Sequence, residues 1–135
     1  MAAGQSRSDR SLQSTYQGAR FVERGVPHVV IRRFDVFRNE SPHTARRFPF
    51  FLVVQSDLLG SLVTCVVVPL GKPAIVKNKP AQTLIPMLDV GADKFVMYTP
   101  EVGAVPSAVL RKRETNIEAQ RSIIVRALDF LFEGI

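Results

Sequence analysis

The sequence predicts a mostly β protein, in which a small, strongly curved, mostly antiparallel sheet or barrel is closed by a C-terminal helix. Two observations lead to this fold class: about five short segments between residues 32 and 99 have strand patterns, and the last stretch has helical periodicity. The chain has 135 residues, of which 46% are hydrophobic and 22% charged, as expected for one globular domain.

The predicted strands are residues 32–37, 48–56, 62–70, 84–90 and 94–99. In the first, apolar residues alternate and place Phe34 and Val36 on one face. The third is a run of β-branched residues and is the strongest strand signal in the chain. Pro86 demotes the fourth to an edge strand or a bulge, because proline cannot donate to a neighbouring strand.

The segments between the strands are predicted to be loops. Gln55, Ser56 and Asp57 are expected to end a strand and form a turn through hydrogen bonds from side chain to backbone. This turn contains two exposed-looking leucines, Leu58 and Leu59. Three further segments are interpreted as a surface loop, an irregular stretch and a solvated basic loop without a function: residues 71–82, 101–110 and 111–113.

The C-terminal stretch predicts an amphipathic helix from about Asn116 to Phe132, laid against the sheet. Thr115 and Glu118 have the spacing of a capping box, and Gly134 ends the helix. The apolar side of the predicted helix consists of Ile117, Ile124, Ala127, Leu128 and Leu131.

The last four residues are unusual for a chain end, because Phe132 and Ile135 are large and apolar. Either these residues tuck back into the core of the protein, or they are presented to a partner.

The net charge of +6 is unevenly distributed. Residues 1–48 have nine arginines and four acids, a net of +5, whereas residues 49–135 have nine basic residues and eight acids, a net of +1. The arginines are scattered through a polar leader, which predicts a disordered extension or an early start codon at 1–31 and a folded domain at 32–135. Direct nucleic-acid binding by the nearly neutral segment 49–135 is not expected.

Residue types that carry out chemistry are sparse. His28 and His43 lack partners at metal-ligand spacing, the glycines are scattered, and no catalytic constellation or cofactor motif is present. Cys65 lies in an apolar run, so we expect it to be buried and inert. No apolar run reaches the roughly 20 residues that span a membrane, and a cytoplasmic, reducing location is expected. The residues themselves indicate a small binding domain with an unusual C-terminal tip.

From Arg33 to Ile135 the sequence resembles the CcdB toxins, the toxin half of a plasmid-maintenance toxin–antitoxin pair. The matching segments occur in family order and cover about three quarters of the chain. They are FDVF near the start, VVQSDLL at 53–59, VVVPL at 66–70, FVMYTPEVGAVP at 95–106 and LDFLFEGI at 128–135.

This resemblance implies a homodimer with an SH3-like barrel, the CcdB/MazF-type toxin fold. It also implies a DNA gyrase inhibitor rather than an enzyme: two C-terminal tips bind the dimerisation region of the gyrase A subunit and trap the cleaved gyrase–DNA complex. A CcdA-like antitoxin neutralises the toxin, and the two together repress their own operon. DNA contact in that repressor belongs to the antitoxin.

The resemblance also assigns gyrase-binding positions. Phe132, Gly134 and Ile135 match the family tip, whereas Glu133 replaces a tryptophan that stacks on a gyrase arginine. Three further positions correspond to family residues near gyrase: Asp129 to an asparagine, and Leu58 and Leu59 to two isoleucines. Because Glu133 cannot stack as an aromatic ring does, we expect weaker action on gyrase.

Two alternatives remain open. One is a homologue that no longer poisons gyrase and acts only through antitoxin binding and operon regulation. The other is a MazF-like endoribonuclease, since those toxins share this fold.

Overall fold

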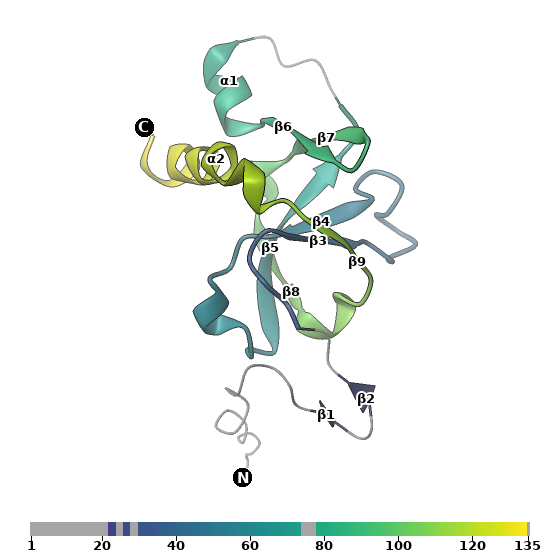
Figure 1. Cartoon of the computed structure of the whole chain (residues 1–135). Helices are drawn as coiled ribbons and strands as arrows, with labels where there is room; N and C mark the ends of the chain where they lie inside the picture. The colour runs from purple at the N-terminus through teal and green to yellow at the C-terminus, as the bar shows by residue number, and fades with distance from the viewer. Residues whose placement is uncertain (1–21, 24–25, 28–29, 74–77, 135) are drawn as a thin grey trace.

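The computed structural model describes residues 22–23, 26–27, 30–73 and 78–134. Its main body is a seven-stranded antiparallel sheet that curls into a half-barrel, with a C-terminal helix at its side (Figure 1). The strands of this sheet are β3 (Asp35–Arg38), β4 (Phe50–Val53), β5 (Thr64–Gly71), β6 (Met87–Val90), β7 (Asp93–Met97), β8 (Gly103–Pro106) and β9 (Arg113–Asn116). This arrangement confirms the predicted fold class.

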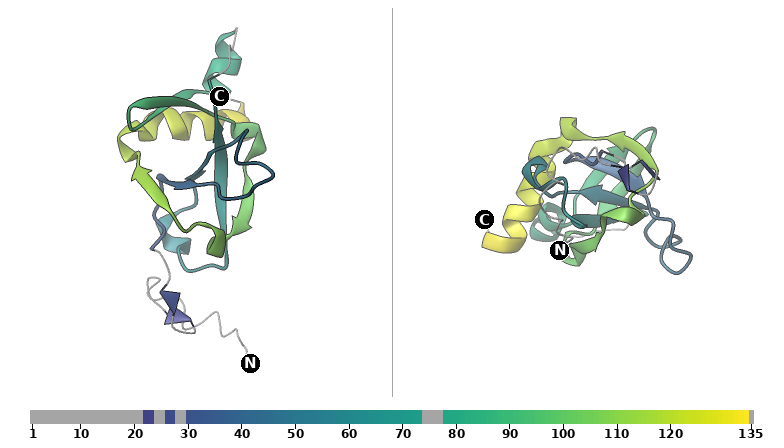
Figure 2. Two further views of the ribbon diagram at one scale, coloured as in Figure 1. Left: turned by 90° about the vertical axis from the view of Figure 1, so that its right-hand side faces the viewer. Right: turned by 90° about the horizontal axis from the view of Figure 1, so that it is seen from below.

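Two α-helices and four short 3₁₀ helices complete the described elements. They are α1 (Lys79–Leu84), α2 (Arg121–Glu133), η2 (Asp57–Leu59), η3 (Thr99–Glu101), η4 (Ser107–Val109) and η5 (Glu118–Gln120). Both views in Figure 2 show α2 lying along one side of the curved sheet. A separate two-stranded ladder, β1 (Val22–Glu23) with β2 (Val26–Pro27), lies within the predicted N-terminal extension.

The strands are ordered β6-β7-β5-β4-β3-β9, and β8 also pairs with β5. Strand β5 is the longest, with eight residues, and it pairs with β8 along its first half and with β7 at its end. On its other edge β5 pairs with β4, where Leu52 lies opposite Val68. This long β-branched strand therefore holds three neighbours together, consistent with its strong sequence signal.

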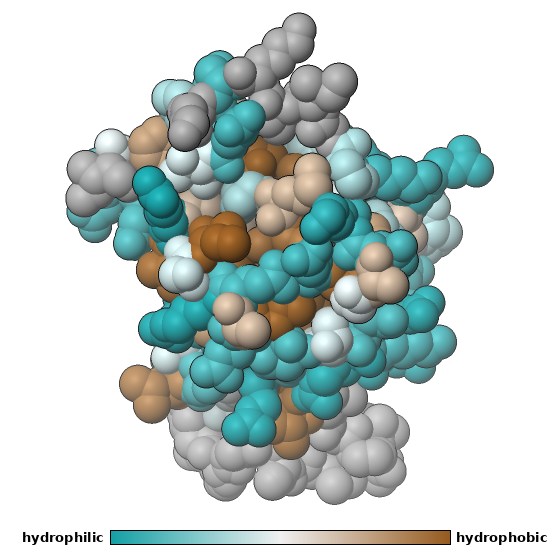
Figure 3. All heavy atoms as spheres, turned by 45° about the horizontal axis from the view of Figure 1, so that its top comes forward, coloured by the Kyte–Doolittle hydropathy of each residue, from teal (hydrophilic) through white to brown (hydrophobic). Residues whose placement is uncertain are grey.

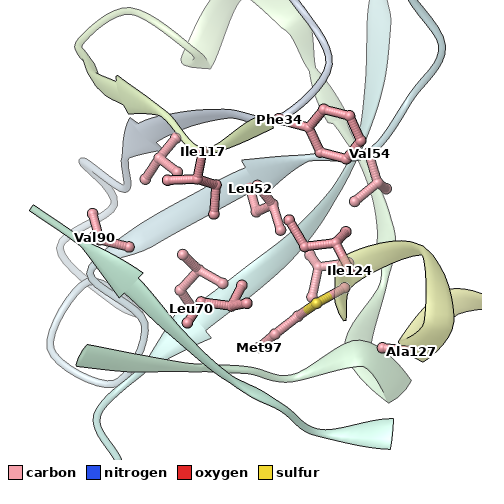
Figure 4. Close-up of a cluster of buried hydrophobic side chains, with 12 residues drawn as sticks. Phe34, Leu52, Val54, Leu70, Val90, Met97, Ile117, Ile124 and Ala127 are labelled. Atoms are coloured by element: carbon pink, nitrogen blue, oxygen red, sulfur yellow. The ribbon is translucent and has the colours of Figure 1, made fainter. Parts of the chain in front are cut away.

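The main hydrophobic core fills the space between α2 and the concave face of the sheet. In Figure 4, side chains from the sheet, among them Leu52, Leu70 and Met97, converge on Ile124 of α2. Ile124 and Ala127 are fully buried in this core, and Val125 and Leu128 of the same helix are partly buried against it. A second cluster lies apart from this core and consists of Phe37, Val53, Cys65, Val67 and Leu110.

The C-terminal helix begins later than predicted, at Arg121 rather than about Asn116. The predicted capping box does not form, because Thr115 belongs to β9 and lies opposite Val36 of β3. Asn116 instead accepts a hydrogen bond from the backbone N–H of Glu118, at 3.0 Å. Backbone pairing with β3 therefore takes the residues that helix capping would have used. The predicted apolar residues still face the protein, although Leu128 and Leu131 are only partly buried.

Residues 71–82 are not a continuous loop, because α1 begins at Lys79 and runs to Leu84. The side chain of Asn78 accepts a hydrogen bond from the N–H of Ala81 at 2.9 Å, and Pro80 lies in the first turn, where its missing N–H is harmless. Strand β6 accordingly begins at Met87 and lies at the edge of the sheet, as the proline before it predicted.

Residues 101–113 also contain more structure than predicted. Strand β8 pairs with β5, so the stretch interpreted as irregular supplies part of the sheet. Arg113, interpreted as part of a loop without a function, begins β9, and its Nε lies 3.1 Å from Oδ2 of Asp35. Pairing between distant strands determines both segments, and local pattern does not reveal it.

Asp35 of β3 binds two side chains of the neighbouring strand β9. Its side chain is 2% exposed, and it accepts hydrogen bonds from the backbone N–H of Arg32 at 2.8 Å and from Nδ2 of Asn116 at 3.0 Å. Phe34, the residue before it, has a φ of 73°, which a side chain that is not glycine rarely adopts. The bonds to Asp35 and the buried Phe34 ring together fix this strained entry into β3.

The exposed edge of β6 is occupied by a side chain. Gln120, at the end of η5, accepts a hydrogen bond from the N–H of Asp89 at 2.9 Å through Oε1. Its Nε2 donates to the carbonyl oxygen of the same residue at 2.8 Å. One amide side chain thereby joins the segment before α2 to the edge strand of the sheet.

Candidate target-binding site at the end of the C-terminal helix

The C-terminal end of α2 projects from the body of the protein (Figure 1). Phe132 is 71% exposed, and Glu133 and Gly134 are exposed as well. Gly134 ends the helix in the left-handed conformation, with φ 77°, and donates its N–H to the carbonyl oxygen of Phe130 at 3.0 Å. The sequence left open whether the tip folds back into the core or points outward. The part of the tip that the structure describes points outward into solvent. Ile135 lies outside the described residues.

The charges along α2 run in the order that opposes its own dipole. Arg121 and Arg126 lie in the N-terminal half, whereas Asp129 and Glu133 lie toward the C-terminal end. A charge of the unfavourable sign in a terminal turn costs about 0.3–1 kcal/mol. All four side chains are exposed, and within the described residues none of them takes part in an ion pair. The order of these charges therefore does not stabilise the helix.

A shallow hollow lies along the exposed side of α2. It is lined by Arg121, Ser122, Val125, Arg126 and Asp129. Figure 3, in which the top of the molecule is tilted forward, shows apolar residues exposed among polar ones on the face that this view presents. The sequence predicted only Asp129 of this set as a binding residue, although helical spacing had placed Arg121, Ser122, Arg126 and Asp129 together on the polar side of the helix. Val125 lies at the border of that side, because it also packs against the main core.

The predicted leucine pair lies in η2. Leu58 is 87% exposed and Leu59 is 44% exposed. Ser56 Oγ accepts a hydrogen bond from the N–H of Leu58 at 3.1 Å, and Asp57 Oδ1 accepts one from the N–H of Arg33 at 2.7 Å. These bonds confirm the predicted structural role of the serine and aspartate, and they hold two leucines out of the core.

The leucine pair of η2 and the C-terminal end of α2 lie on the same side of the molecule. In Figure 1, η2 and the C-terminal end of α2 are both at the left of the sheet, with η2 below the helix. The structure thus places Leu58, Leu59, Asp129, Phe132 and Glu133 on one side, at two separate positions.

Reactive groups are few in the part of the chain that the structure describes. His43 is exposed on a turn, His28 lies outside the described residues, and no group of three metal-binding side chains is found. Cys65 is buried, as predicted, and burial together with the nearby Asp35 carboxylate raises the pKa of its thiol to about 11. No described helix is long and apolar enough to cross a membrane.

The fold defines a class of small protein in which a curved antiparallel sheet supports a projecting C-terminal helix. Residues 33–134 match the CcdB protein family. The chain therefore belongs to the CcdB family, which is a family of toxins from toxin–antitoxin systems. Among solved structures, an endoribonuclease from mycobacterial species has a TM-score of 0.59 at 15% sequence identity, covering 78% of this chain and 93% of its own. At this identity the likeness shows a shared fold.

Proposed function

We propose that this protein is a gyrase-directed toxin, which binds the A subunit of DNA gyrase and traps the gyrase–DNA cleavage complex. The observation that carries the proposal is the tip of α2. In a member of the CcdB family, Phe132 is 71% exposed at an ordered helix end that Gly134 terminates. Exposed aromatic side chains of this kind are typical anchors at protein interfaces.

The proposed action requires binding and no bond chemistry by the toxin. Phe132 supplies the apolar anchor, and Asp129 and Glu133 supply negative charge on either side of it along the helix. Leu58 and Leu59 form a second apolar contact on the same side of the molecule. A homodimer would present two such tips to the two A subunits at their dimerisation region.

A CcdA-like antitoxin would neutralise the toxin and form with it a repressor of their shared operon. A role of the antitoxin in DNA contact is supported by the sequence from residue 49 onward, because residues 49–135 carry a net charge of only +1. Exposed arginines on α2 would suit an acidic antitoxin segment better than they suit a DNA duplex, since two isolated side chains form no continuous basic face.

The test is the amount of linearised plasmid trapped by purified gyrase over a titration of the toxin. We expect the natural protein to trap complexes weakly, and Glu133→Trp to raise its apparent affinity about tenfold, equivalent to about 1–2 kcal/mol from an aromatic anchor. Glu133→Gln is the matched control, because it removes the charge without adding a ring. Each exposed substitution should change the free energy of unfolding by less than about 0.5 kcal/mol.

Three other outcomes would contradict this account. If the natural protein traps complexes as well as the tryptophan variant, Glu133 has a productive partner of its own. If neither traps any, and deletion of Gly134 and the residue after it changes nothing, the chain is a homologue without poison activity. If the purified protein instead cleaves RNA, the endoribonuclease alternative is correct.

A further inference from the structure

One end of the sheet gathers more basic side chains than acidic ones. Arg38 at the end of β3 lies opposite Phe50 at the start of β4, and Phe50 lies opposite Leu70 near the end of β5. The N–H of Arg38 also donates to the carbonyl oxygen of Lys112, just before β9, at 2.9 Å. Six exposed cations, which we call the basic rim, lie at or just beyond these strand ends: Arg38, Arg46, Arg47, Lys72, Arg111 and Lys112.

The basic rim carries an excess of positive charge. Three acids lie among its six cations and leave a net charge of +3: Glu40, Glu101 and Glu114. Glu40 serves two cations at once, at 4.0 Å from Arg111 and 3.3 Å from Lys112, whereas Arg46 and Lys72 form no ion pair among the described residues.

The cations of the rim also project further than its acids. The four paired cations have side chains that are 58–70% exposed, and their three carboxylate partners are 34–46% exposed. Exposed ion pairs of this kind are weak, so an approaching anion of high charge density can take over these cations.

The connection between β3 and β4 presents two of the arginines on a braced support. Asn39 is buried, and its Nδ2 donates to Oγ1 of Thr44 at 2.9 Å and to the carbonyl oxygen of Phe48 at 2.8 Å. Its Oδ1 accepts a hydrogen bond from the N–H of Ser41 at 3.0 Å. The guanidinium of Arg47 lies 4.6 Å from the ring centre of Phe48. These contacts order the connection before any partner binds, which lowers the entropic cost of binding.

Gly71 brings the end of β5 against the same connection. A methyl group on Gly71 would lie 2.8 Å from Cε2 of Tyr98 and 3.1 Å from the carbonyl oxygen of Arg47, and the first distance is too short for a real contact. Glycine therefore lets the backbone of β5 approach Arg47 closely. Lys72 is the next residue, so its ammonium group joins the rim arginines.

We propose that the basic rim binds the phosphate backbone of duplex DNA, without reading its sequence. The rim extends over four neighbouring strands, β9, β3, β4 and β5, which at about 4.8 Å per step span about 14 Å. This length corresponds to about four successive phosphates of one DNA strand, at about 3.4 Å per nucleotide. Four of the six cations are arginines, whose planar guanidinium groups bind phosphate through two parallel hydrogen bonds.

The aromatic residues at this end favour duplex over single-stranded nucleic acid. Proteins that bind single strands stack the bases on exposed aromatic rings. Here Phe48 is buried and Tyr98 is half-buried, and the two rings pack edge to face with their centres 5.4 Å apart. Neither ring offers a free face beside the rim, so the phosphates are the part of a nucleic acid that the rim can bind.

The charge of the folded domain agrees with this role. The segment 49–135 is nearly neutral by itself, but three rim arginines precede it in the sequence: Arg38, Arg46 and Arg47. Residues 32–135 have fourteen basic and ten acidic residues, a net charge of +4. The basic excess of the chain therefore belongs partly to the folded domain, and the rim concentrates most of it at one place.

The rim and the proposed gyrase-binding positions lie on different sides of the molecule. In Figure 1 the connection between β3 and β4 projects to the right of the sheet, whereas η2 and the C-terminal end of α2 lie to the left. This inference rests on the proposed function for its context, because a gyrase–DNA complex and an operator complex both contain DNA. The rim can contact that DNA while the helix tip binds gyrase.

The experiment measures fluorescence anisotropy of a labelled duplex of about 20 base pairs, with the full chain, between about 50 and 200 mM salt. We expect sequence-independent binding with a dissociation constant of about 1–100 µM. The logarithm of the association constant should fall against the logarithm of salt concentration with a slope of about −3, since the rim has three excess charges. Arg46→Glu/Lys72→Glu should weaken binding at least tenfold and make the slope shallower by about 2. Neither residue has a described ion pair to lose.

Arg32→Glu/Arg121→Glu is the matched control, because it changes the net charge equally at the opposite end of β3. Arg32 and Arg121 are exposed, and the guanidinium of Arg121 lies 5.5 Å from the ring centre of Phe34, just before that strand. If the rim variant binds DNA no more weakly than this control, although circular dichroism shows both folded, the proposal is wrong. It is also wrong if the natural protein does not bind the duplex.

Two competitors identify the partner. An oligoglutamate of equal charge that displaces the duplex as well as unlabelled duplex does would make an acidic peptide the partner and overturn the proposal. Tighter binding of a single strand of the same length would overturn the choice of duplex. The test contains no gyrase, so it can fail while plasmid trapping succeeds, and trapping can fail while the rim still binds DNA.

Discussion

Asp35 is the residue whose replacement should reveal most about how β3 and β9 are held together. The change Asp35→Ala removes a carboxylate that is 2% exposed and lies 3.1 Å from Nε of Arg113. It also removes the acceptor for the N–H of Arg32, at 2.8 Å, and for Nδ2 of Asn116, at 3.0 Å. Two contacts between β3 and β9 and one local contact at the entry to β3 are thus lost with one side chain.

The expected cost follows from the exposure of the groups that remain. Removing one partner of a buried ion pair typically costs 3–5 kcal/mol, because the other charge is left without compensation. The Arg113 side chain is 37% exposed, so water can hydrate its orphaned charge. We therefore expect a loss of about 3 kcal/mol in the free energy of unfolding, at the lower end of that range.

Urea denaturation followed by circular dichroism measures this loss, and a surface ion pair supplies the control. Lys94 and Asp89 lie 2.6 Å apart, but both side chains are 61% exposed. Asp89→Ala should cost less than about 1 kcal/mol, because water and salt screen such pairs. If Asp35→Ala costs no more than Asp89→Ala, the carboxylate does not organise the β3–β9 junction and this reasoning fails.

Three further predictions concern the core, the thiol and the domain boundary. Ile124→Ala should lower the free energy of unfolding by about 2–5 kcal/mol, and Leu128→Ala should lower it by less, because Leu128 is only partly buried. Equal losses in urea titrations would mean that the helix is rotated about its axis and buries Leu128 as deeply as Ile124. Because the pKa of Cys65 is raised to about 11, the folded state holds its proton more tightly than the unfolded state. Stability present below about pH 9 should therefore decrease as pH rises toward 11, by about 1.4 kcal/mol per pH unit, and Cys65→Ala should lack this part of the decrease. A chain that begins at Val30 should melt within a few degrees of the full chain, and a large drop in melting temperature would show that the preceding residues pack on the domain.

Buried strands could be predicted from the sequence, because their burial requires runs of apolar residues. The run at 62–70 is a clear example, since β5 is buried along most of its length. Strand β9 has no such run: its residues Arg113–Asn116 are polar and mostly exposed, and pairing with β3, far away in the sequence, makes them a strand. The late start of α2 has the same cause. Helix α1 was the avoidable error, because Asn78 followed by Pro80 is a local signal for a helix start.

The candidate site was partly predictable for the same reason. Leu58 and Leu59 follow turn-forming residues, so their exposure could be inferred from the chain itself. The exposure of Phe132 could not, because the sequence allowed the tip either to fold back or to project. The faces of α2 could be predicted, because the spacing of Ile124 and Ala127 placed Arg121 and Arg126 on the other side of the helix. The burial of Ile124 and Ala127 agrees with that spacing.

Gln120 covers part of an edge of the sheet at which strands of other molecules could add. An edge strand with free N–H and C=O groups is a template on which strands of other molecules can add, and chains of such additions lead to fibres. At Asp89 of β6 both groups are already bonded to one glutamine amide, at 2.9 and 2.8 Å. An incoming strand would have to displace that amide before it could pair there. The side chain that fastens the helix segment to the sheet therefore occupies, at Asp89, both backbone groups with which a strand of another molecule would pair.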